Sequence, residues 1–105
     1  MEKSPESLFI ALEYDRNLSK LDLHGVKAVD VENVIFNFLL QQINLGEYKM
    51  QIIYGRGGSG VLRAKTIEFL NKNMAEPNQD IKLVKVWKES VLESAGGRCL
   101  VILEE

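Results

Sequence analysis

Hydrophobic residues recur at two different spacings along the chain, and each spacing predicts a type of secondary structure. Between residues 31 and 43 they recur every three or four positions, as on one face of an amphipathic helix: Val31, Val34, Ile35, Phe38, Leu39 and Ile43. A second helical series runs over 62–74, before Pro77. We therefore predict two amphipathic helices, the first closed by Gly46 and the second ended before the proline.

Four shorter segments are rich in strand-forming residues: 21–23, 50–54, 81–87 and 100–103. Together with the helices they give the order β-α-β-α-β-β. Strands joined through a helix are expected to run parallel, with right-handed crossovers. The segment before the last strand has no helical period, which favours an antiparallel or neighbouring final pair. The predicted fold class is α/β, a two-layer α+β sandwich with a four-stranded mixed sheet and both helices on one face.

Residues 1–17 precede this pattern as an N-terminal lead-in, and the domain itself covers 18–105. Ser4 followed by Pro5 is typical of a helix start and predicts a short helix over 5–14. An edge strand over residues 8–14 is the alternative. The apolar residues of the lead-in are expected to cover the main core.

Composition is that of an ordinary globular domain: 105 residues, with 46% hydrophobic and 27% charged. No apolar run is long enough to cross a membrane, and the first residues lack the pattern of a signal peptide. The single cysteine, Cys99, cannot form an internal disulfide and is expected to be a small core residue. These features predict a soluble, cytoplasmic protein without a membrane partner.

The charges are unevenly distributed. Overall, 13 basic residues stand against 15 acidic ones, a net charge of −2 that argues mildly against a nucleic-acid binder. Residues 49–72 nevertheless hold five basic residues and one acidic residue, whereas 89–105 hold one basic and four acidic. The basic stretch coincides with the richest run of glycines. A solvated helix face is the alternative explanation for it.

That run of glycines predicts a phosphate-binding loop. Its spacing matches the dinucleotide-binding pattern, but the chain has no room for the paired halves of a Rossmann sheet. Glycines let backbone amides approach an anion, and a helix N-terminus favours negative charge. The predicted phosphate-binding residues are Gly55, Arg56, Gly57, Gly58, Ser59, Gly60 and Arg63, with Lys27 from the preceding loop. A purely structural strand-to-helix turn is the alternative.

The one histidine, His24, follows the first predicted strand. Loops that follow parallel strands gather at one end of a sheet, so His24 is expected beside the glycine loop. Asp22 alternates to the same side of the strand and could orient the imidazole or help to deprotonate a hydroxyl. In the alternative interpretation, both residues only cap and bond the following helix. The scattered acids and lone cysteine do not predict a metal site, and we expect no cofactor.

Three motifs together resemble the Smr (small MutS-related) domain family over about residues 19–104. They are the Leu-Asp-Leu-His-Gly run at 21–25, the glycine loop at 54–63, and the paired-glycine turn at 96–97 that leads into an apolar strand. The resemblance implies a fold like the C-terminal domain of bacterial translation initiation factor three. It also implies nucleic-acid binding and, in many members, endonuclease activity on RNA or DNA, with ribosomes or a larger repair or quality-control protein as partners.

The resemblance maps the family's aspartate and histidine onto Asp22 and His24, and its glycine-loop residues onto Gly55, Arg56, Gly57 and Gly60. This chain has Tyr54 where the family often has a histidine, which removes a possible second acid or base. It also lacks a capping hydroxyl over residues 26–28, where the family often has Thr or Ser.

The leading hypothesis is a metal-independent endonuclease that acts on RNA, or on DNA, through the Asp-Leu-His motif and the basic glycine loop. A non-catalytic nucleic-acid-binding module is the first alternative, and Tyr54 favours it. A protein-interaction domain is the second, supported by the acidic total and the apolar lead-in helix.

Overall fold

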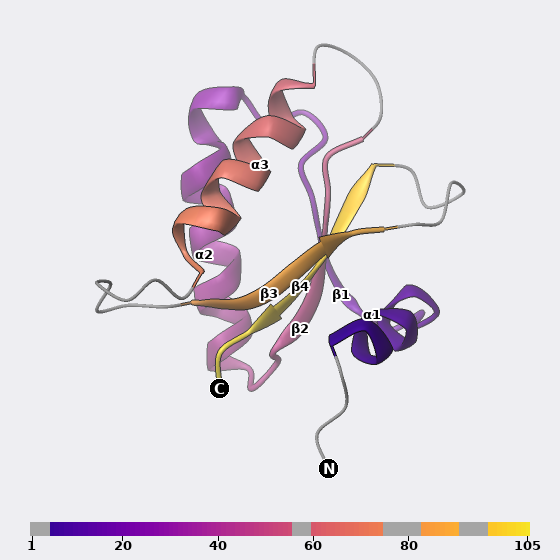
Figure 1. The fold of residues 1–105 in the computed structure, drawn as a ribbon. Helices are drawn as coiled ribbons and strands as arrows, with labels where there is room; N and C mark the ends of the chain where they lie inside the picture. Colours follow the sequence, from indigo (N-terminus) through magenta and orange to yellow (C-terminus); the bar gives the residue numbers. More distant parts are fainter. Residues whose placement is uncertain (1–4, 56–59, 75–82, 91–96) are drawn as a thin grey trace.

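The computed structural model describes residues 5–55, 60–74, 83–90 and 97–105. The elements follow the predicted order, and the lead-in helix precedes them in the chain (Figure 1). They are α1 (Pro5–Glu13), β1 (Ser19–Asp22), the 3-10 turn η1 (Ala28–Asp30), α2 (Val31–Asn44), β2 (Lys49–Ile53), α3 (Val61–Lys72), β3 (Val84–Glu89) and β4 (Arg98–Leu103). The predicted helix cap Ser4 and the predicted helix limit Pro77 lie outside the described residues.

The four strands form one mixed sheet in the order β1-β2-β4-β3. β1 and β2 are parallel, as predicted for strands joined by a helix, while β4 is antiparallel to both of its neighbours. The register places Asp22 beside Ile53, and Ile53 beside Arg98. Strands β1, β2 and β3 therefore end, and β4 begins, at one end of the sheet, which we call the carboxyl end.

Helices α2 and α3 cover the same face of the sheet, which confirms the predicted two-layer arrangement (Figure 1). Strand side chains alternate between faces, so every second residue of a strand reaches this core. Met50 and Ile52 of β2 point into it, together with Ile35 and Leu39 of α2 and Leu70 of α3. All five are fully buried. The same alternation sends the intervening residues to the opposite face.

Helix α1 covers that opposite face (Figure 1). The predicted helix is present, and the edge-strand alternative is wrong. The expectation that the lead-in covers the main core is also wrong, because Phe9 and Leu12 pack in a separate cluster with Leu100 and Ile102 of β4. The physical reason is that β4 is a central strand with an apolar run, and both faces of such a strand need cover.

Two local expectations are confirmed. Gly46 has a φ of +74° just after α2, and its N–H donates to the carbonyl of Ile43 at 3.0 Å, as in a glycine helix cap. Cys99 is fully buried in the main core. None of the described helices is long and apolar enough to span a membrane.

Candidate functional site

The turn after β1 presents His24 at the carboxyl end of the sheet. The backbone N–H of Leu23 donates to the carbonyl of Ile53 at 2.8 Å, so the pairing of β1 with β2 continues one residue beyond the strand. Val26 N–H then donates to the Leu23 carbonyl at 2.9 Å, with Gly25 at a φ of +81°. A positive φ at the third position is typical of a type II turn and favours glycine. His24, at the second position, is exposed directly beside the strand that enters the glycine loop.

Asp22 stabilises the backbone of this turn. Its Oδ1 atom accepts a hydrogen bond from the backbone N–H of His24 at 2.9 Å. Leu21 and Leu23 pack toward the α2–α3 core, so strand alternation places the Asp22 side chain on the other face. Within the described residues, Asp22 makes no hydrogen bond to the imidazole, and the observed bond is of the kind that the capping interpretation expects. Catalytic roles for Asp22 and His24 stay predictions.

The start of the glycine loop is held by the paired-glycine turn. The backbone N–H groups of Tyr54 and Gly55 both donate to the carbonyl oxygen of Gly97, each at 2.9 Å. Gly55 and Gly60 have φ values of +81° and +77°, so the first and last glycines of the loop adopt a conformation that other residues avoid. Two motifs that are separate in the sequence therefore support one another at the carboxyl end.

The middle of the loop carries four of the predicted phosphate-binding residues. Arg56, Gly57, Gly58 and Ser59 lie outside the described residues, and their roles stay predictions. Gly60 is the N-cap residue of α3 and has no side chain that could cap the helix. The first-turn amides of α3 therefore follow directly on the loop, and a helix N-terminus favours negative charge.

Arg63 takes part in a contact that the sequence did not predict. Its Nε donates to Oε1 of Glu89 at 2.6 Å, and the hydroxyl of Tyr54 donates to the same oxygen at 3.0 Å. We call these three residues the Tyr54–Arg63–Glu89 cluster. Glu89 lies 26 positions after Arg63 in the chain, and only the sheet order brings the end of β3 to the first turn of α3. No local signal in the sequence could have found this pair.

The cluster changes the proton affinities of its members. The guanidinium of Arg63 holds the pKa of Glu89 below its usual range, so this carboxylate is ionised at neutral pH. Burial, and then the neighbouring Cys99 and Glu89, raise the pKa of Tyr54 well above that of a free phenol. Tyr54 therefore stays protonated and acts as a hydrogen-bond donor, and it is no substitute for a histidine base.

Lys27 follows the turn that carries His24, just before η1. It is the exposed residue before η1, and it makes no side-chain capping bond; Asp30, at the start of α2, makes none either. This agrees with the absence of a capping hydroxyl noted in the sequence. Turn η1 contacts α3, so the segment that carries Lys27 lies alongside the helix that carries Arg63 (Figure 1).

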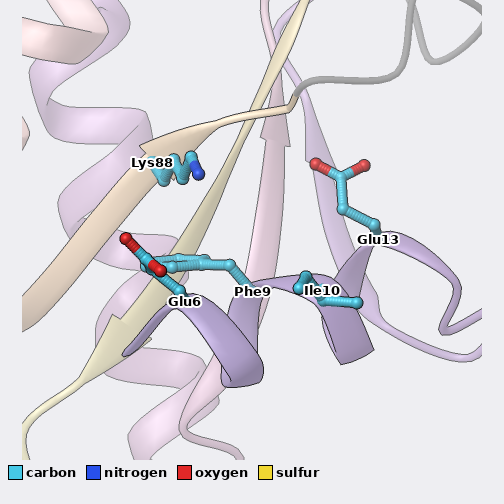
Figure 2. Close-up of a pocket in the computed structure, with 5 residues that line it drawn as sticks. All are labelled: Glu6, Phe9, Ile10, Glu13 and Lys88. Carbon is cyan, nitrogen blue, oxygen red and sulfur yellow. The ribbon is translucent and has the colours of Figure 1, made fainter. Parts of the chain in front are cut away.

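A pocket of about 300 Å³ lies elsewhere, between α1 and the end of β3 (Figure 2). It is lined by Glu6, Phe9, Ile10, Glu13 and Lys88. None of the predicted site residues lines this pocket. In the part of the chain that the structure describes, no group of three or more His, Cys, Asp or Glu residues is arranged to hold a metal ion.

The sequence model of the Smr domain matches residues 21–104, which is most of the chain. This chain belongs to the Smr domain family. The family is associated with nucleic-acid binding and with nucleases. The comparison with curated protein sequences found no match.

Two solved Smr structures share the fold. The Smr domain of Thermus thermophilus MutS2 is 21% identical with a TM-score of 0.69, and the match covers 84% of this chain and 100% of that one. YdaL from Escherichia coli, a stand-alone small MutS-related protein, is 17% identical with a TM-score of 0.71, and the match covers 100% of this chain and 80% of that one. Both likenesses establish the α+β Smr fold with its four-stranded mixed sheet.

Proposed function

We propose that this Smr domain is an endonuclease that binds RNA at the carboxyl end of its sheet and cleaves it slowly without a metal ion. The observation that carries the proposal is the hydrogen bond from Leu23 to Ile53, at 2.8 Å. This bond sets the turn that bears His24 next to the residue pair, Tyr54 and Gly55, that opens the glycine loop. A base and an anion-binding loop side by side are what phosphodiester cleavage requires.

The chemistry needs only groups of this chain and of RNA. His24 takes the proton from a ribose 2′-hydroxyl, because imidazole is the side chain that exchanges a proton near neutral pH. The 2′-oxygen then attacks phosphorus, the bond from phosphorus to the 5′-oxygen breaks, and the leaving oxygen takes up a proton. Amides of the glycine loop and Arg56 stabilise the charge that develops on the phosphoryl oxygens. The products are a 2′,3′-cyclic phosphate and a 5′-hydroxyl.

Asp22 has a positioning role in this scheme. Its hydrogen bond to the His24 backbone, at 2.9 Å, stiffens the turn from which the imidazole extends. The second proton transfer lacks a well-placed partner, because the raised pKa of Tyr54 makes its phenol a poor acid at neutral pH. Water or a lysine must then protonate the leaving oxygen, so the reaction is expected to be slow.

A non-catalytic nucleic-acid-binding module is the second candidate function. It is favoured by the bond of Asp22 to backbone rather than to imidazole, and by Tyr54 in place of a second acid or base. Both candidates predict binding that weakens steeply as salt rises, because phosphate contacts release counterions. A protein-interaction domain would lack this dependence. We propose that either activity takes place in the cytoplasm, with ribosomes or a larger repair or quality-control protein as the partner. Co-sedimentation of the protein with ribosomes tests the ribosome partnership.

The test compares His24→Ala with the unchanged protein on labelled single-stranded RNA and on duplex DNA, with and without EDTA. We expect EDTA-resistant RNA cleavage that His24→Ala lowers by roughly 10²–10⁴-fold while RNA affinity is kept. Asn44→Ala is the matched control, because this exposed residue ends α2 at the far end of the sheet and should leave cleavage unchanged. Strict Mg²⁺ dependence, 5′-phosphate products or full activity of His24→Ala would refute the mechanism. Salt-sensitive binding with no cleavage would support the non-catalytic module.

A further inference from the structure

The Tyr54–Arg63–Glu89 cluster has the form of an occupied anion site. Its two donors come from separate segments, Tyr54 from the position just after β2 and Arg63 from the first turn of α3, and both donate to one oxygen. Oε1 of Glu89 lies 2.6 Å from Nε of Arg63 and 3.0 Å from the hydroxyl of Tyr54. A guanidinium and a hydroxyl that converge on one oxygen suit a phosphate as well as a carboxylate.

The cluster is open to exchange with solvent. The Arg63 side chain is 53% exposed and that of Glu89 is 38% exposed, so a ligand can reach both. An ion pair with this exposure is held weakly. The bond from Arg63 to Glu89 runs through Nε, whereas a phosphate that approaches freely can accept two parallel N–H bonds from the guanidinium. Glu89 can turn toward water without becoming a buried, unpaired charge.

The tyrosine explains why Glu89 should be replaced and not merely released. Tyr54 is only 8% exposed, and its hydroxyl donates to Glu89 in the free protein. If Glu89 turned away with nothing in its place, this donor would lose its acceptor in a partly buried position, which is unfavourable. A phosphate oxygen at the same place restores the bond.

We propose that Glu89 occupies a phosphate position in the free protein, and that an RNA phosphate displaces it from Arg63 and Tyr54 on binding. The inference rests on the proposed function, because it takes RNA as the ligand. Glu89 is then a specificity-determining residue of the nucleic-acid site. An anion that binds Arg63 more strongly than a carboxylate does displaces Glu89. A more weakly binding anion does not, because Glu89 stays paired with Arg63.

The first experiment measures the Kd of a short fluorescein-labelled single-stranded RNA for Glu89→Gln, by fluorescence anisotropy at several salt concentrations. The variant keeps the shape of the side chain and removes its charge. We expect the Kd to fall about three- to fivefold, which is about 0.7–1 kcal/mol. The dependence of log Kd on log salt should steepen by up to about 0.7, the value for one phosphate contact on a single strand, because the variant releases no carboxylate that takes up a counterion.

Glu47→Gln is the matched control. Glu47 is exposed between α2 and β2, away from the carboxyl end, and its replacement changes the net charge by the same amount. Its Kd should change less than twofold. A Glu89→Gln protein that binds no more than twofold better than Glu47→Gln, or more weakly, overturns the inference.

Arg63→Gln is measured with Glu89 present and in the Glu89→Gln variant, to test whether Glu89 competes with RNA for Arg63. With Glu89 present, Arg63→Gln removes both the phosphate contact and the ion pair that must break to form it, so the two effects offset and the Kd should change less than twofold. With Gln at position 89, the same change should remove the whole gain in affinity. Equal losses in the two backgrounds would show that Glu89 does not restrain Arg63, and would overturn the inference.

Inorganic pyrophosphate separates this inference from the proposed function. If RNA binds all the proteins alike, RNA binding stands and the role of Glu89 is wrong. If no protein binds RNA but pyrophosphate raises the Tm of Glu89→Gln more than that of the unchanged protein, the anion exchange stands and the RNA function is wrong. If neither probe distinguishes the proteins and RNA does not bind, both are wrong.

Discussion

The ion pair between Glu13 and Arg98 is expected to be the contact that fixes α1 on the sheet. Nη2 of Arg98 lies 3.1 Å from Oε2 of Glu13, and the two side chains are only 11% and 6% exposed. Nη1 of Arg98 donates to Gln51 at 2.6 Å, and the Ser90 hydroxyl donates to Glu13 at 2.8 Å. The perturbation that we choose is Glu13→Gln, which keeps the shape of the side chain and removes its charge.

The expected cost follows from the burial of the pair. Removal of one partner from a buried ion pair destabilises a protein by about 3–5 kcal/mol, because a charge is left uncompensated away from water. Arg98 keeps its bond to Gln51 and a longer one, 3.3 Å, to the backbone carbonyl of Glu13. We therefore expect the lower end, about 3 kcal/mol in the free energy of unfolding. For a domain near 100 residues this lowers the Tm by roughly 12–24 °C.

The assay is urea unfolding followed by circular dichroism, applied to Glu13→Gln and to a double-mutant cycle made of Glu13→Leu, Arg98→Met and the two changes combined. Replacement of both charges by apolar residues is expected to cost far less than either single change, since no charge is left alone. Glu68→Gln is the control, because its partner Lys72 and Glu68 itself are more than half exposed, and it should cost at most about 1 kcal/mol. A loss below about 1 kcal/mol for Glu13→Gln, or additive effects in the cycle, would refute the reasoning.

The remaining predictions concern the carboxyl end and the core. Gly55→Ala should cost about 1–2 kcal/mol in unfolding free energy through the φ of +81° alone, since no atom crowds the added Cβ. Gly55→Asn should cost less, because asparagine tolerates this conformation better. Equal Tm values for the unchanged protein and both variants would contradict this. Because Arg63 lowers the pKa of Glu89 in the folded state, the pair stabilises the protein above the ordinary glutamate range and loses that effect as pH falls through the lowered pKa. The Tm difference between the unchanged protein and Glu89→Gln should thus be small and positive near neutral pH and vanish as the pH falls through the lowered pKa of Glu89; a difference that grows in acid would be the wrong sign. Burial raises the pKa of the Cys99 thiol to about 12, so a thiol reagent should label Cys99 in urea and not in the native protein, and rapid native labelling would count against the buried position.

The sequence by itself determined the elements and most of their order. The three-to-four residue spacing over 31–43 is a local property, and it reappears as α2 with its buried Ile35 and Leu39. Strand composition located all four strands, and the helix between the first two predicted their parallel pairing. Gly46 is likewise a local signal, because a positive φ depends on the residue at that position.

The sequence also placed His24 beside the start of the glycine loop, since parallel strands joined by a helix end together. It did not predict the partner of Asp22. Strand alternation puts Asp22 and His24 on one side. It does not reveal that the Asp22 carboxylate accepts a hydrogen bond from the backbone amide of the turn. The family resemblance identifies Tyr54 only as a replacement for a histidine, and nothing in the sequence indicates that its hydroxyl donates to Glu89.

Only the tertiary structure decided which distant groups meet. Glu13 and Arg98 are 85 positions apart, and Arg63 and Glu89 are 26 apart. These pairs depend on the sheet order β1-β2-β4-β3 and on α1 covering the face opposite α2 and α3. Periodicity reports which face of an element is buried, but it does not report which element covers that face. That choice is made by the packing of all the elements at once, because each apolar face needs a partner and β4 has two.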